Sequence, residues 1–212
     1  MKNILQFLLC LAFLSLSDNA LAQKIFSEGL IKYEVYVNDG NKPEGIYVIY
    51  IKGGNIKREL VMNNGFNNIT LYNHKSGNTL SLNGTDDRKF ALEITATELK
   101  EKNKRFENAV YTTLDRNKKI AGYACRANQI TYVQGETANF YFTPDLIPQN
   151  ESFNAMFPGL NGIPLEYEIS SQGGVVMKFV ATIVDIKAID SKIFELPQEY
   201  KIVTKSELEK LK

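Results

Sequence analysis

The chain has 212 residues, with 25 Lys and Arg, 24 Asp and Glu and one His, which leaves a formal net charge of +1. So balanced a charge argues against a general binder of polyanions, and we expect no nucleic-acid partner. A single histidine excludes metal sites built from several histidines, and we predict neither a metal site nor a cofactor.

Residues 1–22 have the pattern of a secretory signal peptide. Lys2 supplies a positive charge, residues 4–16 form an apolar run, and Ala20-Leu21-Ala22 is a small-residue cleavage motif. The run is shorter than the roughly 18 to 20 residues of a membrane-spanning helix, and Cys10 lies inside it rather than in a lipidation motif. We expect cleavage near Ala22 and a periplasmic or secreted mature chain, residues 23–212, that is one domain without a transmembrane segment.

Apolar runs with a period of two predict strands along the first half of the mature chain. They cover residues 26–37, 45–52, 56–62, 66–72, 79–82 and 88–94. Gly53-Gly54-Asn55 and Asn63-Asn64-Gly65 are turn sequences, so these strands should form an antiparallel meander. Residues 95–104 predict a helix with Leu99 as its main apolar contact.

The second half continues the pattern. Strands are predicted at residues 109–114, 125–133, 137–143, 163–170 and 175–189, and the last two form a long hairpin. Residues 151–157 predict one or two helical turns. Thr204 and Glu207 fit a capping box that opens a C-terminal helix over residues 206–211.

Many short strands with tight turns and few helices predict a mainly β (α+β) fold. We expect a single strongly curved antiparallel sheet that forms a half-open barrel, with a few helices on its concave face. A β-sandwich is the alternative.

Few residues offer catalytic chemistry. Cys125 is the one cysteine after residue 22 and His74 is the one histidine, so a Cys125–His74 pair is the candidate nucleophile of a hydrolase. A free cysteine in a strand is more often a buried packing residue, and we expect no catalytic residue. Glu166 and Glu168 share a strand face, where solvent contact is favoured over calcium binding or acid–base chemistry.

The aromatic residues are more informative, with 11 Tyr and 12 Phe. Tyrosine combines an apolar ring with a polar tip, which suits the rim of a lipid-sized cavity. Six tyrosines lie in predicted strands, namely Tyr33, Tyr47, Tyr72, Tyr132, Tyr141 and Tyr167. We predict Tyr33, Tyr47 and Tyr141 as ligand-binding residues, with ordinary sheet packing as the alternative.

The connection between Pro148 and Pro164 is unusually apolar. Loops normally run over the surface and are polar, yet this one carries Phe153, Met156, Phe157 and Leu160. We expect these four side chains to bury against the sheet and to contact ligand. The segment is then either a movable lid over a cavity or a fixed plug that completes the core.

Four stretches resemble an exported family of Gram-negative bacteria known as domain of unknown function 4412. They are KKIAGYACRA (118–127), FYFTPDL (140–146), GLNGIPLEYEI (159–169) and SKIFELPQEYK (191–201). The resemblance implies that the motif residues are structural, and these are Gly122, Tyr123, Cys125, Thr143, Pro144, Gly162, Pro164, Leu165 and Glu166.

That family is similar to the lipoprotein carriers LolA and LolB and to the RseB sensor domain. The resemblance implies an unclosed antiparallel barrel whose concave face holds acyl chains beneath helices. In the LolA carriers an arginine of the sheet governs release, and none of Arg58, Arg88 and Arg126 can be matched to it.

Three functions follow in order of preference. The first is a non-enzymatic periplasmic carrier or sensor for a lipid, a lipoprotein or another apolar ligand such as an acyl chain. The second is a structural envelope protein that binds a protein partner through a sheet edge. The third is a hydrolase that uses Cys125.

Overall fold

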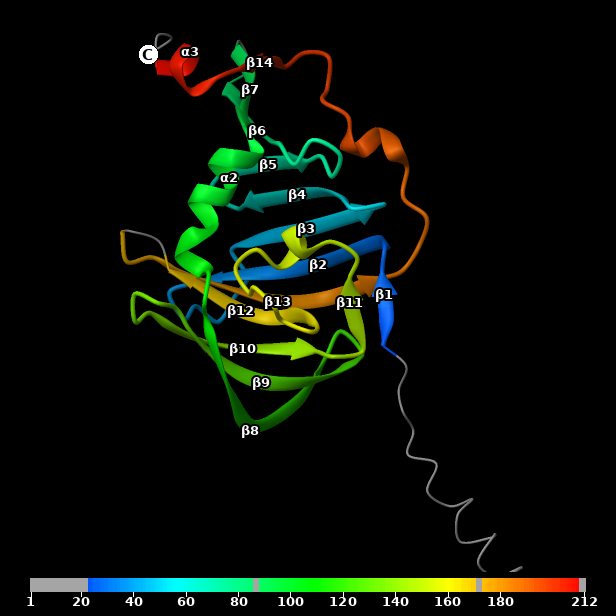
Figure 1. Cartoon of the computed structure of the whole chain (residues 1–212), viewed down its shortest axis with the longest axis vertical. Coiled ribbons are helices and arrows are strands. Elements are labelled where there is room, and N and C mark those ends of the chain that lie inside the picture. The colour runs from blue at the N-terminus through cyan, green and yellow to red at the C-terminus, as the bar shows by residue number, and fades with distance from the viewer. Residues whose placement is uncertain (1–22, 86–87, 171–172, 210–212) are drawn as a thin grey trace, which may run out of the picture.

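The computed structural model describes residues 23–85, 88–170 and 173–209 (Figure 1). The predicted signal peptide and its cleavage site, as well as the end of the predicted C-terminal helix, lie outside these ranges. Within them, no helix combines the length and the apolar character needed to span a membrane.

Strands dominate the chain. They are β1 (Lys24–Phe26), β2 (Glu28–Val37), β3 (Gly45–Lys52), β4 (Asn55–Met62), β5 (Asn67–Tyr72), β6 (Thr79–Thr85), β7 (Arg88–Ile94), β8 (Val110–Ile120), β9 (Tyr123–Thr131), β10 (Thr137–Thr143), β11 (Leu146–Pro148), β12 (Ile163–Ser170), β13 (Val176–Asp185) and β14 (Lys201–Val203). The helices are α2 (Ala96–Asn103) and α3 (Lys205–Glu209), with short 3-10 helices η1 (Lys104–Phe106), η2 (Glu151–Asn154) and η3 (Ser191–Phe194). Each predicted strand is present, and the mainly β class is confirmed.

Twelve strands form one sheet, in the order β14-β7-β6-β5-β4-β3-β2-β13-β12-β10-β9-β8. β1 and β11 form a separate two-stranded sheet, so no second sheet of comparable size faces the main one as a β-sandwich would require. The meander β2 to β7 meets the strands of the second half where β2 pairs with β13, with Val35 opposite Phe179. The described strands do not close into a ring, because β8 and β14 remain as edges.

The core lies on one face of this sheet. Along β2, Ile31, Tyr33 and Val35 are buried while the residues between them are partly exposed, as the period of two requires. Figure 1 shows α2 and the loop around η2 in front of the central strands. The two segments therefore cover the same side of the sheet.

Helix α2 confirms the helix predicted at residues 95–104. Thr95 is its N-cap and forms a capping box with Glu98, whose side chain accepts from the Thr95 N–H. Leu99 is only half-buried, and no residue of α2 is buried. The predicted capping box of Thr204 and Glu207 is also present ahead of α3.

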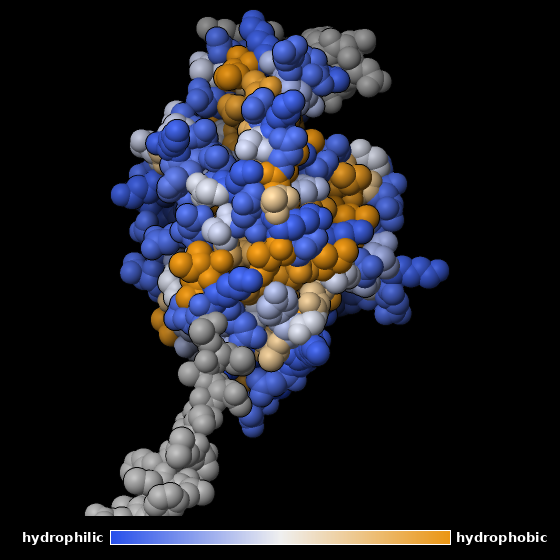
Figure 2. Space-filling model, turned by 90° about the vertical axis from the view of Figure 1, so that its right-hand side faces the viewer, coloured by the Kyte–Doolittle hydropathy of each residue, from blue (hydrophilic) through white to orange (hydrophobic). Residues whose placement is uncertain are grey.

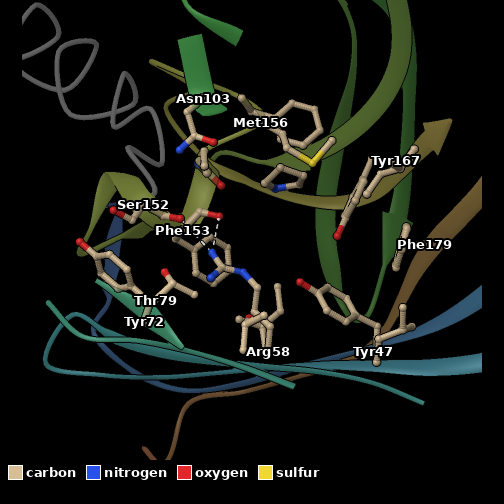
Figure 3. A pocket seen from close by; sticks show the side chains of 18 of the residues that line it. Tyr47, Arg58, Tyr72, Thr79, Asn103, Ser152, Phe153, Met156, Tyr167 and Phe179 are labelled. Carbon is tan, nitrogen blue, oxygen red and sulfur yellow. Dashed lines mark hydrogen bonds between the residues drawn. The ribbon is translucent and has the colours of Figure 1, made fainter. Parts of the chain in front are cut away.

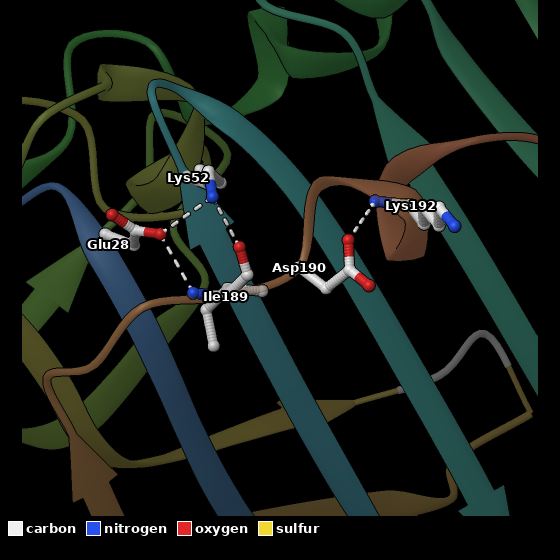
Figure 4. Close-up of polar contacts among 5 residues, drawn as sticks. All are labelled: Glu28, Lys52, Ile189, Asp190 and Lys192. Atoms are coloured by element: carbon white, nitrogen blue, oxygen red, sulfur yellow. Dashed lines mark hydrogen bonds and ion pairs between the residues drawn. The ribbon is translucent and has the colours of Figure 1, made fainter.

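Three strand predictions need correction. The strand predicted at residues 175–189 ends at Asp185, because the chain leaves the sheet toward a separate anchor at Ile189. There the Ile189 N–H donates to Glu28 Oε1, and Lys52 Nζ donates to the Ile189 carbonyl (Figure 4). β8 runs past residue 114 to Ile120, since a bulge between Leu114 and Asn117 lets its pairing with β9 resume.

The third correction concerns strand direction. β1 pairs in parallel with β11, and β14 pairs in parallel with β7, so the pairing is not wholly antiparallel. β1, β11 and β14 have three residues each, too few for a periodic pattern. The helical turns predicted at residues 151–157 shorten to η2.

A second, smaller cluster lies beside the main core and is made by Leu71, Leu82 and Ala91, against which Leu196 and Tyr200 pack. The C-terminal segment thus packs against β5, β6 and β7, the last strands of the meander. Figure 2 looks onto the side that carries β1, where an apolar band crosses a mostly hydrophilic surface. Ile25 in β1 is 63% exposed.

Candidate functional site

A cavity of about 410 Å³ lies between the sheet and its cover (Figure 3). The strands contribute mainly Tyr33, Tyr47, Ile49, Arg58, Leu60, Thr70, Tyr72, Tyr167, Ile169, Met177 and Phe179. The cover contributes mainly Leu99, Lys102, Asn103, Phe153, Met156 and Phe157. The lining is mostly apolar with a few polar groups, which is the composition of small-molecule sites.

Strand register brings these side chains to one face. Tyr33 of β2 lies opposite Tyr47 of β3, and Tyr47 lies opposite Leu60 of β4. Ile49 lies opposite Arg58 in the next row. Because side chains alternate between faces, these residues point to the same side of the sheet.

Aromatic rings form the part of the cavity at the junction of β2, β12 and β13. The Tyr167 and Phe179 rings are stacked, with centroids 5.0 Å apart. Tyr33 lies edge-on to Tyr167 at 5.8 Å, and Tyr47 lies 5.2 Å from Phe179. These four aromatic rings therefore lie on both sides of the junction at which β2 pairs with β13.

Residues 150–160, here called the cover segment, are packed in place. Phe157 is buried, with ring centroids 4.7 Å from Phe140 and 5.7 Å from Tyr167. Phe153 is buried against Phe26. Met156 also lines the cavity but is only half-buried, so Phe153 and Phe157 serve both the core and the cavity wall whereas Met156 serves mainly the wall.

Side chains of the sheet also hold the cover segment by its backbone. The Tyr132 hydroxyl donates to the Met156 carbonyl at 2.8 Å, and the Tyr111 hydroxyl donates to the Pro158 carbonyl at 3.1 Å. Burial raises the pKa of Tyr132 to about 12 and also raises that of Tyr111. Both hydroxyls are therefore protonated donors at neutral pH.

Arg58 is the charged group of the sheet wall. Its Nη2 donates to the Ser152 carbonyl at 2.8 Å and to the Phe153 carbonyl at 3.4 Å (Figure 3). It occupies the apolar face of β4, in the series Ile56, Arg58, Leu60. A charged residue at an apolar position of an alternating strand pattern could have marked Arg58 as a site residue. It was not among the residues predicted to bind ligand.

Three tyrosine hydroxyls are buried near Arg58. Desolvation raises the pKa of Tyr33 and Tyr167 well above the ordinary value and also raises that of Tyr47, while the Arg58 charge acts in the opposite direction. The hydroxyls thus stay neutral. The Tyr33 hydroxyl donates to the Pro164 carbonyl at 2.9 Å, which ties β2 to the start of β12.

The predicted ligand-binding residues divide into two groups. Tyr33, Tyr47, Phe153, Met156 and Phe157 line the cavity. Tyr141 and Leu160 are not among the lining residues: the Tyr141 ring lies 3.9 Å from Lys118 Nζ, and Leu160 packs against the main core. Tyr72, Tyr167, Met177 and Phe179 line it without having been predicted as ligand-binding residues.

The glycines and prolines of the family motifs lie at turns, at a bend and at a close backbone contact. Gly122 has a φ of 90° in the β8–β9 turn, and a Cβ on Gly162 would lie 2.5 Å from the Thr143 carbonyl oxygen. Pro164 supplies the carbonyl that accepts from Tyr33. Pro144 follows β10, at the bend between β10 and β11.

The remaining motif residues pack or pair. Thr143, Leu165 and Cys125 are buried, and Tyr123 is half-buried against the core. Glu166 departs from the predicted solvent face, because it is half-buried and pairs with two lysines, Lys118 and Lys178.

The structure does not pair Cys125 with His74, whose Nδ1 contacts the Asn150 amide instead. Six strands separate β5, after which His74 lies, from β9, which contains Cys125, and adjacent strands are about 4.8 Å apart. The thiol donates instead to the Tyr123 carbonyl at 3.6 Å. Desolvation raises the pKa of Cys125 to about 11, which disfavours the nucleophilic thiolate.

Comparisons with known proteins give distant similarities. No family model matches the chain, so the resemblance to domain of unknown function 4412 stays a prediction, and no curated protein matches it significantly. The structure of MucB is similar over 85% of this chain and 62% of its own, with 14% identity and a TM-score of 0.45. PNGF-II is similar over 86% of this chain and 33% of its own, with 15% identity and a TM-score of 0.43.

A LolA superfamily protein from Nitrosomonas europaea is similar over 81% of this chain and 91% of its own, with 8% identity and a TM-score of 0.35. The chain thus spans a third of PNGF-II and under two thirds of MucB. Since these TM-scores lie below 0.5, the function is inferred from the cavity itself.

Proposed function

We propose that the protein is a non-enzymatic carrier or sensor that binds a lipid or another apolar ligand in the cavity. The single observation that carries this proposal is the cavity of about 410 Å³ between the sheet and the cover segment. Its walls are mainly aromatic and aliphatic. Each methylene buried there contributes about 0.8 kcal/mol, so one acyl chain would bind usefully and reversibly.

The proposal includes the shape and the compartment. The open sheet would act as a half-open barrel whose concave face is the cavity wall. Residues 23–212 would form the exported domain, released from residues 1–22 by signal peptidase. Intact mass of protein recovered from the periplasm tests this, with Gln23 expected as the first residue.

The alternatives receive less support. A protein partner would extend one of the two edges, β14 or β8. β14 has only three residues, and β8 is interrupted by a bulge and most of its residues are exposed and polar or charged. Such features are ways of blocking edge pairing. A hydrolase that uses Cys125 lacks a base, since His74 lies elsewhere.

Binding of a fluorescent fatty-acid probe tests the proposal with two matched tryptophan variants of β4. Leu60 lines the cavity, whereas Val61, the next residue, is 45% exposed and lies outside it. Leu60→Trp should fill the cavity and weaken probe binding at least tenfold, while Val61→Trp should bind like the parent. Equal binding by the two variants, or no binding by the parent, would overturn the proposal.

A further inference from the structure

The charges around the cavity are all of one sign. Among the described residues that line it, two are cations, Arg58 and Lys102, and none is Asp or Glu. Lys102 is exposed on α2, where water solvates its charge. Arg58 is half-buried between the apolar Ile49 and the neutral Thr70 on the flanking strands.

Arg58 has no acidic partner in the part of the chain that the structure describes. Its guanidinium donates from Nη2 to two backbone carbonyls and is hydrogen-bonded to the neutral Tyr47 hydroxyl. A guanidinium carries five N–H donors in a planar fork, so its capacity is not filled by the cover segment. A half-buried cation without a counter-charge is costly, and an anion in the cavity would offset that cost.

Neutral hydroxyl donors lie next to the same group. Tyr47 is the diagonal neighbour of Arg58, since it pairs with Leu60, and it hydrogen-bonds to the guanidinium. Burial keeps the Tyr167 hydroxyl protonated, and Figure 3 shows it directed toward the Tyr47 hydroxyl. Hydroxyls of this kind donate to an anion.

We propose that the ligand is an amphiphile with one acyl chain and an anionic headgroup, bound with the headgroup inward at Arg58, Tyr47 and Tyr167. The inference rests on the proposed function and names the ligand class of that site. Carboxylate and phosphate share the required chemistry, because both accept two parallel bonds from arginine. The chain would lie along Ile169, Met177 and Phe179.

The volume favours one chain over several. At about 410 Å³ the cavity is near the lower end of the 300–1,000 Å³ typical of small-molecule sites. A free fatty acid or an alkyl phosphate matches that size better than a lipid with two or more chains.

The test compares ligands that differ only in the headgroup. Hexadecanoic acid, hexadecyl phosphate, hexadecanol and hexadecylamine would each displace a neutral fluorescent probe from the full mature chain at neutral pH. At least one of the two anions should displace the probe at about tenfold lower concentration than the alcohol, the equivalent of roughly 1.4 kcal/mol. The amine should be the weakest competitor.

Two arginine variants locate the effect. Arg58→Gln should bring the anions to the level of the alcohol measured on the same variant, so that the tenfold ratio between anion and alcohol falls to about one. Arg126→Gln, an exposed position on β9 outside the cavity, should keep the parental preference. If Arg58→Gln fails to fold, Arg58→Lys should retain part of the preference, since it keeps the charge but loses the fork.

The outcomes separate the two proposals. Equal displacement by acid, phosphate and alcohol overturns the headgroup inference and leaves the proposed function standing. A preference that survives in Arg58→Gln also overturns it. Failure of the parent to bind any amphiphile overturns the proposed function, and the inference falls with it.

Discussion

Nδ2 of Asn150 lies 2.8 Å from Nδ1 of His74, while Oδ1 of the same amide accepts from the Ser152 N–H at 2.7 Å. The amide group donates to the ring, so Nδ1 is the acceptor and neutral His74 carries its proton on Nε2. Asn150 thereby caps η2 and ties the cover segment to the β5–β6 turn.

The cap predicts a graded loss of stability. Asn150→Ala should lower the free energy of unfolding by about 1 kcal/mol, the usual cost of an N-cap, whereas Asn150→Ser keeps a capping oxygen and should cost less. Urea denaturation measures both. Equal losses would mean that the contact to His74, and not the cap, is what Asn150 contributes.

Met156 and Phe157 should respond differently to substitution. Phe157→Ser removes a buried ring in contact with Phe140 and Tyr167, and should lower stability by about 3–5 kcal/mol. Met156→Ser should cost much less, because Met156 is half-buried at the cavity, and should weaken binding of a fatty-acid probe. Thermal melting and probe titration of the two single variants separate a plug from a ligand contact. A Phe157→Ser protein that melts like the parent contradicts the core assignment.

The strands were predictable because their signal is local. A period of two in the sequence decides which side chains share a face, and turn residues such as Asn63, Asn64 and Gly65 decide where the chain reverses. The cavity depends instead on contacts between residues far apart in the sequence, such as Tyr33 with Tyr167. No local pattern specifies that β13 pairs with β2, and this pairing brings Phe179 beside Tyr47.

In the cover segment, too, the local pattern was predictable and the long-range contacts were not. Its apolar density predicted burial of four side chains, of which Phe153 and Phe157 are buried whereas Met156 and Leu160 are half-buried. Its anchors were not predictable, because Arg58 and Tyr132 reach backbone carbonyls, which carry no sequence signature.

Two motif glycines should tolerate alanine to different extents. A Cβ on Gly162 would lie 2.5 Å from both the Thr143 carbonyl oxygen and the Phe142 ring, whereas a Cβ on Gly122 would meet nothing within 4 Å. Gly122→Ala should cost only the roughly 1–2 kcal/mol of a positive φ, and Gly162→Ala should cost more. Chemical denaturation of the pair tests the order, and the reverse order would contradict the close approach of β10 to residue 162.

Cys125 should behave as a packing residue. Its pKa is raised to about 11 by burial, so its contribution to stability is fully present below the ordinary thiol pKa and is lost as the pH rises toward 11. Cys125→Ala should cost about 1 kcal/mol and leave probe binding intact. A thiol reagent should label the native protein far more slowly than the unfolded chain at neutral pH, and rapid native labelling would count against burial.

Acid should weaken the contact by which Glu28 anchors the C-terminal segment at Ile189. The Ile189 N–H and the Lys52 ammonium hold the pKa of Glu28 below its ordinary value. Its stabilising effect is therefore fully present above the ordinary carboxyl pKa and is lost as the pH falls through the lowered value. The protection of the Ile189 amide against hydrogen exchange, relative to the intrinsic rate at each pH, should fall in that range. Glu28→Gln should remove the pH dependence, and an unchanged dependence in that variant would assign it to another group.

The pairing of β2 with β13 also sets the order in which the molecule assembles. The meander β2 to β7 is built from neighbours in sequence, whereas Val35 and Phe179 meet only after most of the chain has been placed. Loop-closure entropy makes such a long-range pairing slow. The cavity wall spans this junction, with Tyr47 on one side and Tyr167 on the other, so no earlier intermediate contains the complete site. The recovery of probe fluorescence during refolding would thus time the docking of β13.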